Sequence, residues 1–149
     1  MKVSLLQEGH SGAPSKNFLQ SRFWAGFKSA FGWSSMRFEV TGDPAVSAVP
    51  YELSVLVRRL FGAFSFAYVP HGPETENQRD SYQDQLVHLG KALRKWLPWT
   101  CLFIRFDPGW YHAGCDAEKP DRPLFDRPLR KASDVQPPDT VVLDLSFSD

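Results

Sequence analysis

The chain has 149 residues, of which 42% are hydrophobic and 14% aromatic, so it is long and apolar enough to form one folded domain. Its 17 basic residues balance its 17 acidic residues, which gives no general attraction to nucleic acid or to an anionic membrane. Two cysteines are too few for a disulfide framework. No apolar run approaches the roughly 20 residues of a membrane-spanning helix, so we expect a cytoplasmic protein with reduced thiols.

The N-terminal part of the chain predicts a short strand followed by a helix. The strand is expected over residues 2–6 and the helix over residues 22–31, where the Ser21 hydroxyl can accept a hydrogen bond from a free backbone N–H. Gly32 follows the helix, at a position where a left-handed residue commonly ends it. Aromatic residues of the helix recur three and four positions apart, which predicts a stripe on its buried face: Trp24, Phe27 and Phe31.

The middle of the chain predicts three strands and a long amphipathic helix. The strands are expected over residues 36–40, 53–60 and 63–69, the last two joined as a hairpin at Phe61-Gly62. The helix is expected over residues 77–96, because large residues recur there at spacings of four and three: Tyr82, Leu86, Leu89, Leu93 and Trp96.

The last third of the chain predicts two strands on either side of an irregular segment. Residues 100–106 form a nearly continuous apolar run, which is typical of a central strand covered on both faces. Residues 109–138 lack periodicity and are rich in proline, so they read either as a segment with one short helix or as a substrate-facing flap. A final strand is expected over residues 140–145. This order of elements predicts an α/β (α+β) fold, a mixed sheet with packed helices.

Four segments, taken in chain order, carry a resemblance to a known family: residues 18–33, 57–73, 104–108 and 136–145. The first contains Trp-Ala-Gly-Phe-Lys ending at Lys28, and the second ends in Phe-Ala-Tyr-Val-Pro-His-Gly-Pro at Pro73. The third is Ile-Arg-Phe-Asp-Pro, and the fourth ends in Val-Val-Leu-Asp-Leu. Together they resemble the Fem-type (FemAB-like) peptidoglycan-bridge aminoacyltransferases.

The resemblance implies a fold and a place within a longer protein. Family members resemble two acetyltransferase-like (GNAT-like) units in one chain, and this chain looks like the first unit. Residues 1–17 would be an N-terminal strand and loop, and residues 18–149 the acetyltransferase-like unit. The family's second unit opens with a basic Lys-x-Arg-x-x-Ile stretch, which would lie beyond Asp149. We therefore expect an incomplete fragment that is inactive by itself and lacks the C-terminal elements that complete the first unit.

The resemblance also implies a reaction and its partners. The activity would be transfer of an amino acid from aminoacyl-tRNA, as co-substrate, to the stem peptide of a peptidoglycan precursor in cell-wall cross-bridge synthesis. An amine attacks an activated ester in this reaction, so no metal and no other cofactor is expected. The partners would be a lipid- or nucleotide-linked muropeptide, and aminoacyl-tRNA through the missing part, with no DNA. A lipid-linked acceptor would bring the chain to the membrane surface.

Five residues match positions that bind substrate in the family. Lys28 matches a lysine that helps hold phosphate of the precursor, as a mobile point charge. Tyr68, His71 and Gly72 close a strand at a Gly-Pro exit, where backbone N–H groups can face a ligand. Asp107 ends an apolar strand, where side chains often meet ligand, and is the candidate catalytic residue beside the acceptor peptide.

Each of these residues also has an ordinary structural explanation. Lys28 can be a solvated helix lysine, and the Gly-Pro turn can simply end a strand. Asp107 can cap the following turn or pair with Arg105. The family usually has a larger basic or polar residue where His71 stands and an apolar residue where Glu74 stands.

Other functions remain open from the sequence. The chain could be a non-catalytic remnant or binding module of the same fold. It could also be an acetyl-CoA-dependent N-acyltransferase, although it has no Gln/Arg-x-x-Gly-x-Gly/Ala segment for the coenzyme pyrophosphate. A metal site is not expected, because the spacing of the candidate ligands fits no zinc pattern: Cys101, His112, Cys115 and Asp116.

Overall fold

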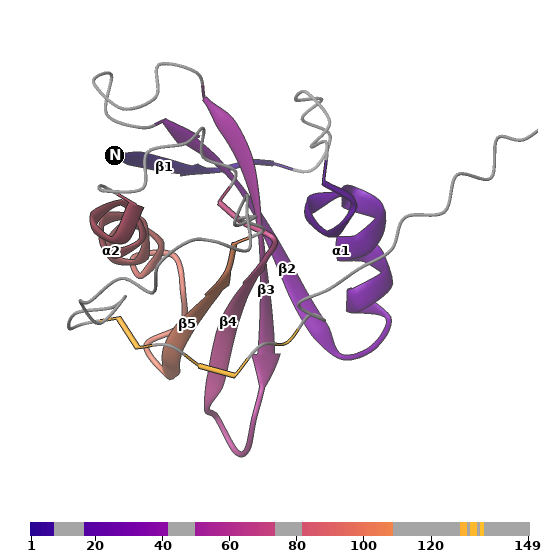
Figure 1. Ribbon diagram of the computed structural model, residues 1–149. Coiled ribbons are helices and arrows are strands. Elements are labelled where there is room, and N and C mark those ends of the chain that lie inside the picture. Colours follow the sequence, from indigo (N-terminus) through magenta and orange to yellow (C-terminus); the bar gives the residue numbers. More distant parts are fainter. Residues whose placement is uncertain are drawn as a thin grey trace, which may run out of the picture.

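The computed structural model describes residues 1–7, 17–41, 50–73, 82–108, 129–130, 132–133 and 135. Within them the fold is α+β, with two α-helices and a five-stranded mixed sheet in the strand order β1-β2-β3-β4-β5 (Figure 1). The elements are β1 (Lys2–Leu5), a 3-10 helix (Phe18–Gln20), α1 (Arg22–Ser29), β2 (Trp33–Thr41), β3 (Tyr51–Arg59), β4 (Ser65–Pro70), α2 (Tyr82–Leu93) and β5 (Cys101–Asp107).

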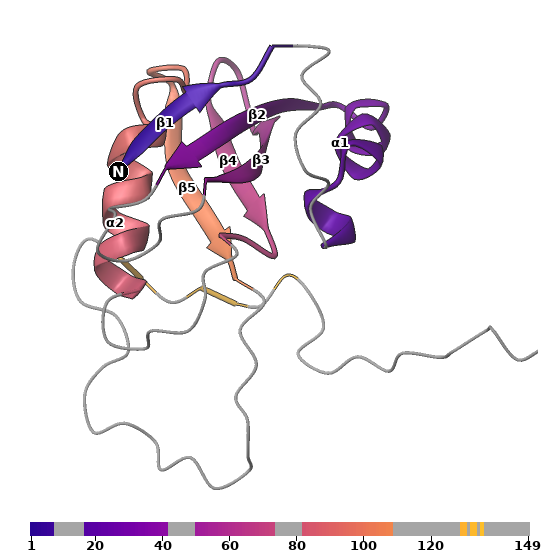
Figure 2. The same cartoon turned by 90° about the horizontal axis from the view of Figure 1, so that it is seen from above.

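The sheet is antiparallel from β1 to β4, and β5 then adds in parallel beside β4. The parallel pair needs a crossover connection, and this connection contains α2. The two helices lie on opposite faces of the sheet, as the view from above shows (Figure 2). The sheet therefore has one face packed under α2 and another that carries α1.

The hydrophobic core lies between α2 and the sheet. Leu89 and Leu93 of the helix are fully buried, because they point from one stripe into side chains that alternate along the strands. The strand residues of this core cluster are Phe38, Val40, Leu53, Val55, Ala67, Val69 and Cys101. The amphipathic stripe predicted for this helix is confirmed at Leu86, Leu89 and Leu93.

On the opposite face, the buried side chain of Gln20 joins β3 to β4. The ladder between these strands runs from Arg59↔Ser65 to Leu56↔Tyr68 and ends there. Beyond it, the Gln20 Oε1 accepts a hydrogen bond from the Ser54 N–H at 2.7 Å, and its Nε2 donates to the Pro70 carbonyl. One carboxamide thus satisfies backbone groups on both strands where they stop pairing with each other.

Several local predictions are confirmed. The Ser21 hydroxyl caps α1 by accepting from the Trp24 N–H at 3.1 Å, and Gly32 has a φ of +78°. Residues Tyr51–Arg59 and Ser65–Pro70 form the expected hairpin. The helices end earlier than expected, α1 at Ser29 and α2 at Leu93. The expected segments 77–81 and 140–145, and most of 109–138, lie outside the described residues.

The prediction that the aromatic stripe of α1 is buried is wrong at two of its three residues. Phe27 is 44% exposed and Phe31 is 64% exposed, whereas Trp24 is half-buried and Ala25 is buried. The Trp24 and Phe27 rings stack, with 5.3 Å between their centroids. The spacing of the aromatic residues identified the stripe correctly, but the face of α1 that approaches the sheet carries the small residue Ala25.

The prediction that residues 100–106 form a strand covered on both faces is also wrong. Among the described residues, β5 pairs only with β4 and is the last strand of the sheet. Leu102 is 53% exposed and Phe103 is 50% exposed. The covered strand is β4, where five of six residues are buried.

We predict that Gln20→Ala destabilises the fold, because it leaves the buried Ser54 N–H and Pro70 carbonyl without the hydrogen bonds that Gln20 makes to them. Each unsatisfied group costs about 1–3 kcal/mol. Urea unfolding, followed by circular dichroism, measures this loss. Gln7→Ala is the matched control at an exposed position and should change stability by less than about 0.5 kcal/mol. Equal stability of the two variants would contradict the role given to Gln20.

Candidate functional site

A continuous row of side chains crosses four strands on the face that carries α1. Residues paired across neighbouring strands point to the same face of a sheet. Trp33 on β2 pairs with Arg58 on β3, and Arg58 pairs with Phe66 on β4. Tyr68 lies two residues after Phe66 on β4, on the same face, and pairs with Arg105 on β5. We assign the candidate site to this row, because the row combines aromatic rings with charged groups.

The indole of Trp33 contacts most of this row. Its ring lies 5.6 Å from the Phe66 ring in an edge-on arrangement and 6.2 Å from the Tyr68 ring. The Lys28 ammonium lies over the same indole at 5.8 Å, and the Arg58 guanidinium at 5.3 Å. Trp33 therefore holds two cations and the tyrosine of the candidate site around one ring.

Lys28 comes from the last turn of α1 and is half-buried. Its ammonium also lies 4.7 Å from the centre of the Trp24 ring, so it sits between two indoles. No carboxylate forms an ion pair with Lys28 or Arg58 among the described residues. A lysine held by aromatic faces keeps its charge available to an anion, because no acidic side chain neutralises it.

A different basic residue on this face is already paired. Arg37 donates to the Glu52 carboxylate, and both side chains are mostly buried. Burial lowers the pKa of the Arg37 guanidinium, while the charge of Glu52 opposes this shift. This pair is a structural feature of the face, since each charge is matched by its neighbour.

Asp107 lies at the carboxyl end of β5, beside the carboxyl end of β4. Pro70 and Asp107 are register partners in the parallel pair, and such strand ends often face a ligand. The Tyr68 hydroxyl donates to the Asp107 Oδ2 at 2.8 Å. The buried tyrosine thus fixes the direction of the carboxylate.

The expected alternative pairing of Asp107 with Arg105 does not occur among the described residues. Arg105 instead donates to the Ser133 carbonyl. The carboxylate is therefore oriented by a neutral hydroxyl group rather than neutralised by its nearest arginine.

The turn after β4 places His71 and Gly72 next to the Gln20 bridge. The His71 carbonyl accepts a hydrogen bond from the Asn17 side chain at 3.3 Å. The backbone of His71 has a φ of +42°. A Cβ at Gly72 would lie 3.0 Å from both Gln20 Nε2 and Val69 Cγ1, so this position is closely packed. Gly72 therefore has a packing reason to be glycine, independent of any ligand.

The structure thus brings Lys28, Tyr68 and Asp107 to one face, connected through Trp33. Sequence reasoning missed Trp33 and Arg58 as site residues. Strand alternation could have found them, because an in-register hairpin places Trp33, Arg58 and Phe66 side by side. The missing information was the register itself, which depends on the length of the segment between β2 and β3.

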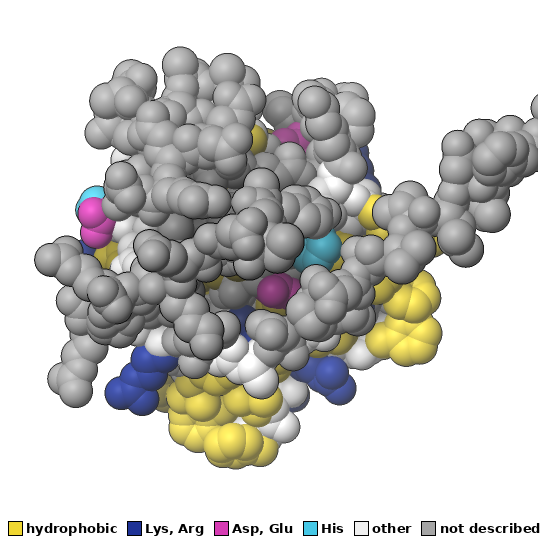
Figure 3. Space-filling model, in the orientation of Figure 1, with side chains coloured by type: hydrophobic (Ala, Val, Ile, Leu, Met, Phe, Trp, Pro, Cys, Tyr) yellow, Lys and Arg dark blue, Asp and Glu magenta, His cyan; other side chains and the backbone are white. Residues whose placement is uncertain are grey.

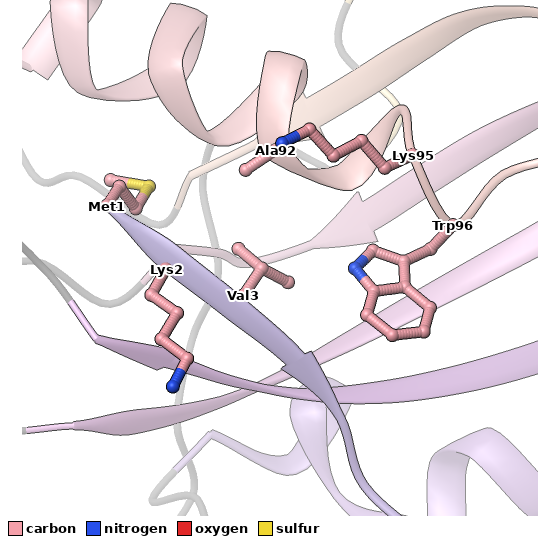
Figure 4. Close-up of a pocket in the computed structure, with 6 residues that line it drawn as sticks. All are labelled: Met1, Lys2, Val3, Ala92, Lys95 and Trp96. Carbon is pink, nitrogen blue, oxygen red and sulfur yellow. The ribbon is translucent and has the colours of Figure 1, made fainter.

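A hollow lies on the other side of the sheet from the candidate site. It has a volume of about 350 Å³ and lies between β1 and the end of α2, with Trp96 beside Val3 (Figure 4). Its walls come from Met1, Lys2, Val3, Ala92, Lys95 and Trp96. None of the candidate site residues contributes to it.

The described part of the chain holds no cluster of three or more His, Cys, Asp or Glu side chains arranged to hold a metal ion. Cys101 is buried there, and His112, Cys115 and Asp116 lie outside the described residues. No helix in the described ranges is both long enough and apolar enough to cross a membrane.

Comparison with known proteins finds no similar protein. The chain matches no protein-family model, no curated protein and no solved structure. The chemistry of the site therefore rests on the placement of its own residues.

We predict a measurable coupling between Tyr68 and Asp107, because the hydroxyl donates to a carboxylate. In a double-mutant cycle, Tyr68→Phe and Asp107→Asn should show a coupling energy of about 1–2 kcal/mol in urea unfolding. The control cycle combines Tyr68→Phe with Asp84→Asn, an exposed carboxylate on α2, and should give a coupling near zero. Additive effects in the first cycle would mean that the hydrogen bond does not orient Asp107.

Proposed function

We propose that this chain is a GNAT-like unit that binds the acceptor substrate of a Fem-type aminoacyltransferase. The acceptor would be the stem peptide of a peptidoglycan precursor in the cytoplasm, and aminoacyl-tRNA the co-substrate. The order of the elements supports this fold. A first helix follows β1, three antiparallel strands follow the helix, and α2 leads into a strand parallel to β4.

One observation carries the proposal: an oriented carboxylate shares one face with a cation that has no acidic partner among the described residues. Lys28 and Asp107 are linked by an unbroken series of contacts, from Lys28 to Trp33, from Trp33 to Tyr68, and from Tyr68 to Asp107. A muropeptide precursor has matching chemistry, because it carries phosphates at one end and a peptide amine at the other. Such a ligand suits a site with separate positive and negative ends.

Lys28 would hold phosphate of the precursor, with Arg58 adding a second charge on the same indole. Two cations attract a phosphate more strongly than one, and their attraction weakens with salt. Aromatic contacts would keep both side chains in place before the ligand arrives. This arrangement limits the side-chain entropy lost on binding.

Asp107 would act on the amine of the acceptor peptide. Tyr68 donates to Oδ2, which leaves Oδ1 directed to accept a hydrogen bond from the amine. As the amine nitrogen bonds to the ester carbonyl carbon, its proton passes to the carboxylate. The bond from that carbon to the tRNA oxygen then breaks, and the leaving oxygen takes up the proton. His71 and Gly72 would border the peptide at the end of β4.

An acetyl-CoA-dependent reaction has less support. The chain lacks a glycine-rich segment for the coenzyme pyrophosphate, and β4 stays paired with β5 to its carboxyl end at Pro70↔Asp107. No gap opens between the two backbones that could receive a pantetheine arm.

We predict that the chain binds a nucleotide-linked muropeptide and that Lys28→Ala weakens this binding about tenfold or more, because a charged contact to phosphate is lost. The salt dependence of the dissociation constant should also become shallower. Isothermal calorimetry measures both effects. The matched control is Lys91→Ala, an exposed lysine on α2 across the sheet, which should bind as the unaltered chain does.

Asp107→Asn should weaken binding of a muropeptide with a free acceptor amine, while a muropeptide whose amine is acetylated should bind the variant and the unaltered chain equally well. This pairing separates loss of the amine contact from loss of structure. If Lys28→Ala and Asp107→Asn both leave the affinity unchanged, this face does not bind the acceptor. Absence of any muropeptide binding by the folded chain would refute the proposed function.

A further inference from the structure

Six large apolar side chains lie exposed at the end of the sheet where β4 and β5 begin. Three come from the turn of the β3–β4 hairpin, one from the turn before β5 and two from the start of β5 itself. The Ser65 N–H joins the two turns by donating to the Thr100 carbonyl at 3.2 Å. We call these residues the tip patch: Leu60, Phe61, Phe64, Trp99, Leu102 and Phe103. Trp99 is 85% exposed and Phe61 65% exposed.

The tip patch is presented by an ordered turn. The Leu60 N–H donates to the Phe64 carbonyl at 2.8 Å, and the Phe64 N–H donates to the Phe61 carbonyl at 3.0 Å. Gly62 has a φ of +53°, which a glycine adopts without strain. The Phe61 and Phe64 rings are 5.3 Å apart. The hairpin therefore holds its apolar side chains outward.

Basic side chains flank the tip patch, and the described stretches of chain that form it contain no Asp or Glu. Hydrophobic side chains cover the lower end of the molecule, with Lys and Arg on either side (Figure 3). Arg58 and Arg59 directly precede Leu60 and are exposed, and Arg94 donates to the carbonyl of Trp99. The sequence contains no Asp or Glu from residue 53 to 73 or from residue 85 to 106. Since the whole chain has no net charge, this positive region is a local feature.

We propose that the tip patch docks on the surface of an anionic lipid bilayer. Trp and Phe are favoured at the boundary between headgroups and acyl chains, and Lys and Arg are attracted to anionic headgroups. A projecting hairpin fits a soft bilayer better than it fits a flat protein surface. The basic side chains beside the patch match a surface of uniform negative charge, whereas a second copy of this chain would bring equal positive charge.

This inference goes beyond the proposed function and does not depend on it. The tip patch lies at the amino ends of β4 and β5, and the Tyr68–Asp107 pair lies at their carboxyl ends. The two regions meet at their border, because Phe103 of the tip patch stacks on Phe66 of the candidate row with 5.4 Å between the ring centroids. Vesicles and a muropeptide are separate ligands and are tested with separate variants, so membrane docking and acceptor binding can succeed or fail separately.

Cosedimentation with vesicles tests the proposal. The chain should bind vesicles of phosphatidylcholine mixed with phosphatidylglycerol, bind phosphatidylcholine vesicles much more weakly, and lose affinity as salt increases. Phe61→Ser should weaken binding about tenfold or more, because a buried aromatic side chain is lost from the bilayer. The matched control is Phe23→Ser, the same change at an exposed aromatic residue of α1 (69% exposed), which should leave binding unchanged.

Brominated lipids provide a second readout, because they quench a tryptophan that enters the acyl region. Trp99→Phe should keep vesicle binding and remove most of the quenching. A folded chain that ignores anionic vesicles overturns the proposal, as does equal loss of binding in Phe61→Ser and Phe23→Ser. A dimer in sedimentation velocity that Phe61→Ser dissociates, without vesicle binding, would instead identify the tip patch as a contact between two copies.

Discussion

The carboxamide of Gln20 is the interaction on which the arrangement of the candidate site depends. It accepts from Ser54 and donates to Pro70, and so connects β3 and β4 beyond the end of their own ladder. Because Gln20 ends the 3-10 helix just before Ser21 caps α1, the same contact anchors α1 on the sheet. The closely packed Gly72 allows the chain to turn tightly beside this bridge.

Once α1 is anchored, its last turn brings Lys28 to the indole of Trp33. The strand register then determines which groups share that ring, because Trp33, Arg58 and Phe66 are cross-strand neighbours. Tyr68 extends the row to Asp107 through its hydroxyl group. A positive end and a negative end thus form on one face without contacting each other directly. The proposed acceptor chemistry follows from this separation of charge.

The sequence predicted the helices and strands of this fold better than it predicted which of their faces are buried. Capping at Ser21, the left-handed Gly32 and the periodic leucines of α2 depend on neighbours close in the chain, and all three are confirmed. The burial of α1 and of β5 depends on which strand each element meets in space. Ala25 faces the sheet because only a small side chain allows close approach, and the aromatic spacing of the helix does not contain that information.

In the candidate site, too, the features that depend on nearby residues in the chain were predicted, and those that depend on tertiary contacts were not. Asp107 and Tyr68 were identified as strand-end residues, and the structure adds that one donates to the other. Trp33 and Arg58 were missed, because the strand register that pairs them was not known, and neither was the contact of Gln20 that anchors α1 and brings Lys28 to Trp33. Phe64 and Phe103 of the tip patch were predicted as strand residues, and Phe61 as part of the hairpin turn. The exposure of Phe103 accompanies the position of β5 at the end of the described sheet.

The most direct test of the central claim is a map of amide and indole chemical shifts during titration with a nucleotide-linked muropeptide. Each of the 5 tryptophans contributes its own indole N–H signal, so Trp33 reports on the candidate site and Trp96 on the hollow beside β1. We predict that the largest shifts occur at Lys28, Trp33, Tyr68, His71 and Asp107, with Trp96 unaffected. Shifts centred on Trp96 and Val3, with none at Trp33, would contradict the account.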